Sequence, residues 1–86
     1  MQSVYEGATG TNITSTTTIS NARKLIGIFV SSASSSPTIK VDDGAVAKVG
    51  VFTPLAGVFY PMPMTLETSA VITIANTVDC CVFWGN

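Results

Sequence analysis

The side chains that could act as acid, base or nucleophile are few, and their types limit the chemistry available to this chain. Its 86 residues include no histidine, four lysines and arginines, and five aspartates and glutamates. Without histidine, the Ser–His and Cys–His pairs of nucleophilic catalysis are excluded. The only adjacent carboxylates, Asp42 and Asp43, precede Gly44, and a hairpin loop accounts for them. We therefore expect a protein that is not an enzyme.

Two other features could carry chemistry, but each has a simpler structural explanation. Glu6, Glu67 and Asp79 could in principle supply the paired acids of a glycosidase, although nothing in their spacing favours this. The segment 7–10, with a glycine at each end, lacks the lysine and the strand–helix context of a phosphate-binding loop. We interpret it as a turn.

The two cysteines, Cys80 and Cys81, are adjacent in the sequence. Neighbouring residues of a strand point to opposite faces, so we predict two free thiols, one of them buried, rather than a disulfide. Free thiols fit a reducing cytosol. Two cysteines without histidine do not supply the four ligands of a structural zinc site, and we expect no metal and no cofactor.

Four aromatic residues near strand ends are the candidate contact residues for a second subunit or another protein: Phe59, Tyr60, Phe83 and Trp84. Three of them, Phe59, Tyr60 and Trp84, could instead form a platform on which a sugar ring stacks. Because Phe83 and Trp84 close a strand rather than a loop, packing in the core or at a subunit interface is favoured.

The elements that must position these residues are predicted to be short strands, since apolar and polar residues alternate along most of the chain. Residues 65–75 alternate most clearly, and Ile13 and Ile19 fall on the same face. Residues 22–30 form a nearly continuous apolar run, which predicts a central strand buried on both faces. Gly27 within it indicates a bulge or the close approach of another backbone.

The connections between strands are predicted from serine, glycine and proline. Residues 31–36 contain five serines and are interpreted as a strand end followed by a surface loop. Residues 42–44 are predicted to form a three-residue hairpin loop with Gly44 left-handed, which places Val41 and Val49 on one face with two nearby alanines. Residues 58–60 are predicted to be a short strand that Pro61 and Pro63 end, and the prolines restrict it to a sheet edge or an irregular crossing.

Together these elements predict an all-β fold, a small antiparallel β-sandwich or jelly-roll-like barrel of seven or eight strands. The length is that of a single domain. Within it we expect residues 1–21 to form an N-terminal arm and first strand, and residues 22–86 to form the body of the sandwich.

The composition is unusual for a soluble domain, because only 10% of the residues are charged while 47% are hydrophobic. Nine serines and twelve threonines must supply much of the surface. Few charges give weak protection against association, which favours a protein that contacts copies of itself or a partner. A net charge of −1, with Arg23, Lys24 and Lys40 as the only basic cluster, argues against a nucleic-acid partner.

Membrane insertion and secretion are not expected. The longest apolar run, residues 25–30, is far shorter than the roughly 20 residues that a membrane-spanning helix needs. The first twelve residues are polar and lack the basic start of a secretory signal.

The order of segments resembles a known class of proteins. In ARKLIGIFVSSASSSPTIKVDDG an apolar strand leads into a Ser/Ala-rich turn and a hairpin, and FTPLAGVFYPMPMTLETSAVITIANTVDCCVFWGN continues with a proline-flanked aromatic strand and a last strand that ends on aromatic residues. This pattern, over residues 22–86, is similar to small all-β capsid decoration, or cement, proteins of tailed bacteriophages. No residue-level binding motif accompanies the pattern.

The resemblance implies a structural virion protein, made in the host cytoplasm and located in the virion. Such a protein binds the major capsid protein as a homotrimer and stabilises the shell. Two alternatives remain open. One is a tail or fibre component, and the other is a small ligand-binding β-sandwich such as a glycan-recognition module.

Overall fold

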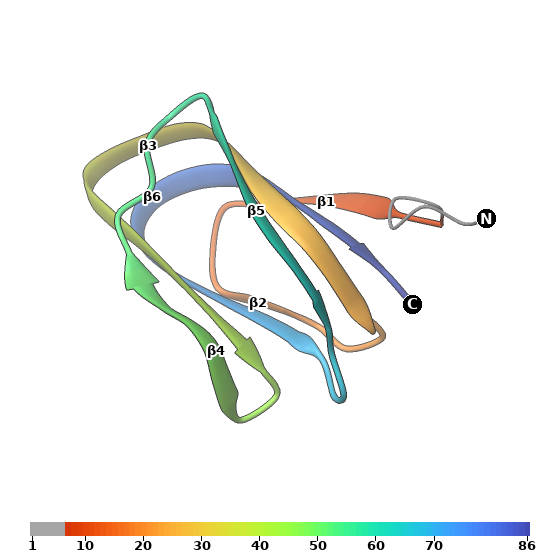
Figure 1. Ribbon diagram of the computed structural model, residues 1–86. Helices are drawn as coiled ribbons and strands as arrows, with labels where there is room; N and C mark the ends of the chain where they lie inside the picture. The colour runs from red at the N-terminus through yellow and green to blue at the C-terminus, as the bar shows by residue number, and fades with distance from the viewer. Residues whose placement is uncertain (1–6) are drawn as a thin grey trace.

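The structure, a computed structural model, describes residues 7–86, and all regular structure in this range is β-strand. The strands form one antiparallel sheet (Figure 1). They are β1 (Thr9–Ile13), β2 (Thr17–Ile19), β3 (Lys24–Asp43), β4 (Val46–Phe52), β5 (Val58–Thr65) and β6 (Ala70–Gly85). The all-β prediction is confirmed. The described residues contain six strands rather than seven or eight, because β3 continues through the serines and β6 continues through residues 76–77.

The two longest strands, β3 and β6, organise the sheet. They pair with each other from Lys24 opposite Gly85 to Asp43 opposite Ala70. In the first half of β3 the strand order is β5-β3-β6-β1, and we call this part the aromatic half-sheet. In the second half the order is β4-β3-β6-β2, and we call it the hairpin half-sheet. Figure 1 shows β3 and β6 curving together between the two halves.

The bend between the halves lies in the serine-rich segment. Ser34 pairs with Thr77 and Thr38 with Ala75, so three residues of β3 lie opposite the single residue Asn76. Ser35, Ser36 and Asn76 all have positive φ, between 56° and 66°. The Asn76 side-chain amide donates a hydrogen bond to the Ser36 carbonyl at 2.7 Å. The prediction of a strand end and surface loop here was wrong, because a bulge bends the paired strands without separating them.

One hydrophobic cluster takes residues from both half-sheets. Ile28 and Val30 come from the aromatic half-sheet, and Ile39 and Val41 from the hairpin half-sheet, and all four are fully buried. The buried residues of the cluster are Ile13, Ile19, Ala22, Leu25, Ile28, Val30, Ile39, Val41, Leu66, Ala70, Ile72, Val78, Cys80 and Val82. Ile13 and Ile19 are among them, so the parity that the sequence predicted is confirmed.

The β3–β4 turn is shorter than predicted. Asp43 pairs with Val46, which leaves the two residues 44–45 as the turn. Gly44 has φ 59°, so the left-handed conformation is confirmed. The three-residue loop over 42–44 was wrong, because a two-residue turn with glycine in its first position matches the twist of the flanking strands.

Register shifts in this hairpin change which side chains are buried. Val41 pairs with Val49, as predicted, but a shift then places Ala47 opposite Asp42. Ala45 and Ala47 are exposed, so their predicted place on the buried face was wrong. An extra residue in one strand of a pair turns the side chains that follow to the other face.

The strand β5 lies at an edge of the sheet, because within residues 7–86 it pairs with β3 alone. The predicted edge position is therefore confirmed. Pro61 and Pro63 lie inside β5, so the prediction that they end the strand was wrong. An edge strand tolerates proline because one of its sides needs no amide donor for a neighbouring strand.

The segment before residue 22 also belongs to the sheet, since β1 and β2 both pair with β6. Between them the Thr16 hydroxyl accepts a hydrogen bond from the Ile74 amide at 3.0 Å and donates one to its carbonyl at 3.3 Å. Gly7 lies in a turn, as predicted, but β1 already begins at Thr9. The start of the predicted arm, residues 1–6 with Glu6, lies outside the described residues.

Candidate functional site

The four predicted contact residues divide between the two sides of the aromatic half-sheet. Tyr60 and Trp84 are half-buried and pack against the core cluster. Phe59 and Phe83, their neighbours along β5 and β6, point to the opposite side because strand side chains alternate. The structure therefore brings together Phe59 with Phe83, but not all four residues on one surface.

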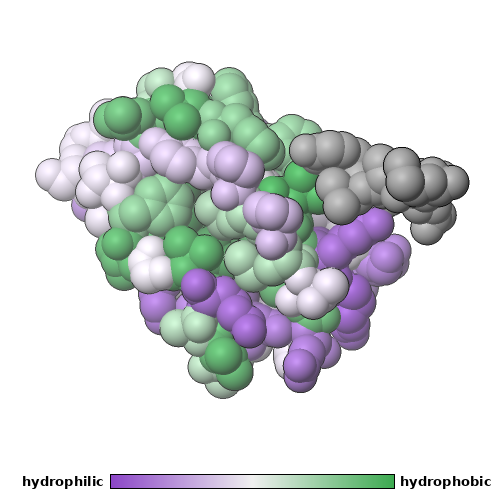
Figure 2. Space-filling view, in the orientation of Figure 1, coloured by the Kyte–Doolittle hydropathy of each residue, from purple (hydrophilic) through white to green (hydrophobic). Residues whose placement is uncertain are grey.

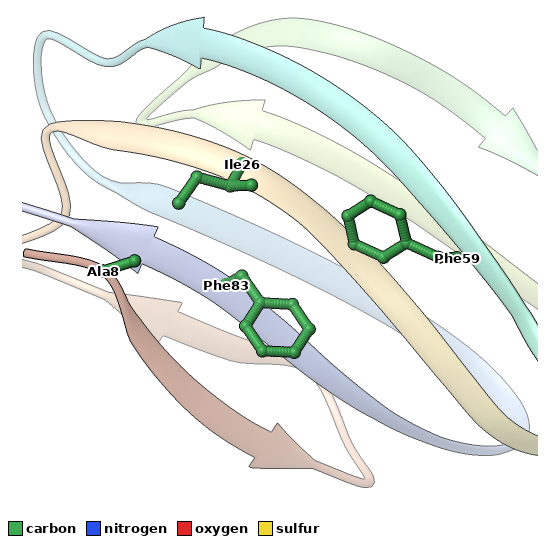
Figure 3. Close-up of a pocket in the computed structure, with 4 residues that line it drawn as sticks. All are labelled: Ala8, Ile26, Phe59 and Phe83. Carbon is green, nitrogen blue, oxygen red and sulfur yellow. The ribbon is translucent and has the colours of Figure 1, made fainter. Parts of the chain in front are cut away.

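Phe59 and Phe83 form one wall of an apolar pocket on the outer side. Their ring centroids are 6.1 Å apart and the rings are inclined at 67°, an edge-to-face arrangement. Ala8 and Ile26 complete the lining of this pocket, whose volume is about 230 Å³. Figure 3 shows the four side chains, which come from β5, β6, β3 and the residue just before β1.

Gly27 and the bulge next to it explain how the Phe59 ring and Ile26 come to line this pocket. A Cβ atom on Gly27 would lie 2.6 Å from the Phe59 Cζ atom, so the ring lies directly over this glycine. A register shift next to Gly27 leaves Ile26 lining the same pocket. Both features that Gly27 predicted, a bulge and a close backbone approach, are confirmed, because the Tyr60 carbonyl oxygen lies equally close.

The outer side includes a residue that the sequence analysis missed. Phe29 pairs with Phe59 across β3 and β5, and the two side chains are 38% and 40% exposed. Residues 22–30 were predicted to be buried on both faces, but Phe29 lies between the fully buried Ile28 and Val30. Strict alternation through the run would have identified it. We call Ala8, Ile26, Phe29, Phe59 and Phe83 the outer aromatic face.

Charged residues are nearly absent from the aromatic half-sheet. The segments 8–13, 24–34, 58–65 and 77–85 contain two charged residues, Lys24 at the start of β3 and Asp79 near the bend. Figure 2 shows the most hydrophilic residues in the lower part of the view and along its right side, where the C-terminus lies in Figure 1. The five residues of the outer aromatic face carry no charge themselves, so a contact limited to them removes no ion from water.

The polar atoms of Tyr60 and Trp84 serve the fold. The Tyr60 hydroxyl accepts a hydrogen bond from the Leu55 amide at 2.7 Å, and its ring lies 5.1 Å from that of Phe52. The Trp84 indole N–H donates to the Thr11 hydroxyl at 2.8 Å. These bonds hold the β4–β5 loop and β1. Because Phe59 points to the side opposite Tyr60 and Trp84, the three aromatics of a sugar-stacking platform do not share a surface.

The adjacent carboxylates have different surroundings. Asp43 is buried and accepts hydrogen bonds from the backbone amides of Glu67 and Thr68, both at 2.8 Å, and of Ser69 at 3.2 Å. These bonds, the one from Glu67 first, hold the pKa of Asp43 below its ordinary value. Asp42 instead forms an ion pair with Lys40 at 3.3 Å. Asp43 thus fixes the β5–β6 turn, a role that the hairpin interpretation missed.

The other residues considered for chemistry do not converge. Glu67 lies in the β5–β6 turn, whereas Asp79 pairs with Ser32 beyond the bend. The Arg23 guanidinium donates to three backbone carbonyls, those of Ser20, Ala22 and Thr68, and so joins two turns. Two residues of the predicted basic cluster therefore make separate structural contacts: Arg23 with these carbonyls and Lys40 with Asp42.

Both cysteines are free, as the sequence predicted. Cys80 is buried in the core and Cys81 is half-buried on the side of the outer aromatic face. Burial is the main reason that the pKa of Cys80 rises to about 11, and it also raises the pKa of Cys81. Within residues 7–86, no three histidine, cysteine, aspartate or glutamate side chains are placed to hold a metal ion.

Comparison with known proteins adds no relative: no protein-family model and no curated protein matches the chain. In the part of the chain that the structure describes, no helix is long and apolar enough to cross a membrane. The candidate site is therefore a surface, the outer aromatic face, defined by its geometry alone.

Proposed function

We propose that this chain is a structural virion protein, a capsid decoration protein that binds the major capsid protein shell through its outer aromatic face. The observation that carries the proposal is that face itself, in which Phe29 and Phe59 are exposed side by side on a half-sheet with only two charged residues, Lys24 and Asp79. Large exposed apolar patches on small proteins are typical of interaction surfaces.

The energetics of such a contact are favourable. At 38% and 40% exposure, Phe29 and Phe59 each leave roughly 80 Å² in water. Burying that area contributes about 2 kcal/mol per ring. The paired strands beneath the rings are already ordered, so little additional conformational entropy is lost on binding.

The proposal also includes a β-sandwich, in which the two half-sheets pack against each other. The core cluster takes residues from the aromatic and the hairpin half-sheets, which supports a sandwich in which the two halves are the layers. In this arrangement the outer aromatic face lies on the outside of one layer. A sandwich of this kind is a rigid body that can lie flat on a shell.

A glycan-recognition module has less support, because Tyr60 and Trp84 use their polar atoms within the fold. A tail or fibre component would need the same apolar contact surface, so the location of the protein in the virion separates it from a capsid component. The homotrimer that the resemblance implies stays a prediction.

Two measurements test the proposal. First, mass spectrometry of purified particles of the phage that encodes this chain should detect it at a copy number in proportion to the major capsid protein. Second, purified protein should bind shells that lack it. Phe59→Ser should weaken this binding at least about tenfold, which corresponds to about 1.4 kcal/mol.

The matched control is Val51→Ser, which removes an apolar side chain from β4 in the hairpin half-sheet that is 65% exposed, more than Phe59. Its binding should equal that of the wild type. Absence of the chain from the particles would reject the virion assignment. Equal losses for the two variants would reject the outer aromatic face as the contact surface.

A further inference from the structure

The free edges of the sheet differ in how they are protected against pairing with another strand. A free edge presents unpaired amides and carbonyls that can add a strand from another chain. Along β5, Pro61 and Pro63 obstruct such pairing. Along β4, two register shifts and Lys48 do so, and β2 is only three residues long.

Within residues 7–86, β1 has none of these protections. Its five residues pair one after another with residues 80–84 of β6, without a register shift. The segment Thr9–Ile13 contains no proline and no charged residue. Thr9, Gly10 and Asn12 are exposed. The outer side of β1 is therefore a regular and uncharged template for a further strand.

We propose that β1 pairs antiparallel with β1 of a second copy of this chain, about a two-fold axis at Thr11. This register opposes Thr9 to Ile13 of the partner subunit, and Gly10 to Asn12 of the partner subunit. Every residue of β1 then has a partner, and no like charges meet. The occupant is a second copy because the segment is complementary to itself in length, charge and face, as a two-fold contact requires.

The pairing has a consequence for the outer aromatic face. Directly opposed residues of antiparallel strands project to the same side of a sheet. The outer aromatic faces of the two copies therefore lie on one side of a continuous sheet with the order β5-β3-β6-β1-β1-β6-β3-β5. This inference goes beyond the proposed function, because a paired face would double the contact with any shell but binding to a shell does not require it.

Disulfide trapping tests the register directly. In a Cys81→Ser background, Thr11→Cys places two thiols opposite each other across the two-fold axis, and a mild oxidant should join them into a covalent dimer. Thr9→Cys is the matched control, because the two copies of residue 9 would be separated by four residues along the strands, about 13 Å. This distance exceeds the reach of a disulfide.

The mass in solution supplies an independent measurement. Sedimentation equilibrium from about 1 to 200 µM should show a species of twice 8.9 kDa. Asn12→Lys, a charge on the exposed β1 edge, should raise the dimer dissociation constant at least about tenfold. Thr18→Lys, the same kind of change on the exposed part of β2, should leave it unchanged.

Three results would overturn the proposal: a wild-type monomer throughout this range, a species of three times 8.9 kDa, which would favour the homotrimer that the resemblance implies, or equal trapping of the Thr9 and Thr11 variants. None of them bears on the shell-binding assay with Phe59→Ser, so failure of β1 pairing and failure of the proposed function are distinguishable. Far-UV circular dichroism spectra that match the wild type establish that the fold is retained, including in Thr11→Cys, which loses the hydrogen bond from the Trp84 indole.

Discussion

The Asp43 carboxylate accepts a hydrogen bond from the Thr68 backbone amide at 2.8 Å, although 25 residues separate them along the chain. This contact joins the end of β3 to the β5–β6 turn, next to the similar bonds from Glu67 and Ser69. A buried carboxylate with three amide donors is stable in its ionised form.

We expect the stability of this protein to decrease in acid through Asp43. Backbone amides, first that of Glu67, lower the folded-state pKa of Asp43 below the ordinary value of 3.8. Its contribution is therefore fully present above pH 3.8 and is lost as the pH falls through the lower folded-state pKa. The urea midpoint of the wild type should fall between pH 5 and pH 2.

The matched variant is Asp43→Asn, which keeps one oxygen acceptor but carries no charge. It should melt about 5 °C or more below the wild type at pH 7. The difference between the two proteins should shrink in acid, where the wild-type carboxylate is also neutral. A constant difference from pH 7 to pH 2 would contradict this account.

Gly27→Ala should destabilise the fold by about 1–3 kcal/mol, because the new methyl group would lie 2.6 Å from the Tyr60 carbonyl oxygen and from the Phe59 ring. The backbone of β5 must move to make room. Gly50→Ala is the control, since no atom lies within 4 Å of its Cβ position. Chemical denaturation of both variants checks the prediction, and similar midpoints would refute it.

Ser35→Val tests the bend between the half-sheets. Ser35 has φ 60°, a left-handed conformation that a β-branched side chain strongly disfavours. We expect a loss of about 1–2 kcal/mol in the free energy of unfolding. Ser34→Val, at the neighbouring exposed position with ordinary φ, should change stability by less than about 0.5 kcal/mol.

The thiols should react slowly in the folded protein. The pKa of Cys80 is raised to about 11, and that of Cys81 is also raised, so little thiolate exists at pH 8. Iodoacetamide at pH 8 should therefore modify Cys81 slowly and Cys80 only after unfolding. Mass spectrometry of native and urea-treated samples measures both rates. Rapid modification of Cys80 in the native sample would contradict its burial.

Much of the fold could be predicted from local pattern. Alternation of apolar and polar residues indicated strands and the shared face of Ile13 and Ile19, and Gly27 indicated a bulge. Steric preferences at single residues also indicated the left-handed Gly44 and the edge position of β5. These features depend on a few neighbouring residues, so the sequence itself contains the information.

Tertiary structure decided the features that depend on long-range pairing. Serines that look like a loop remain in β3, because Asn76 of β6 lies opposite them and donates to Ser36. Phe59 and Phe83 form a surface while Tyr60 and Trp84 serve the core, since the register of three strands sets which parity faces outward. The amino-acid sequence determined that this chain is a charge-poor β-protein with more apolar residues than its core can bury. Only strand register determined which of these apolar residues lie together on the surface.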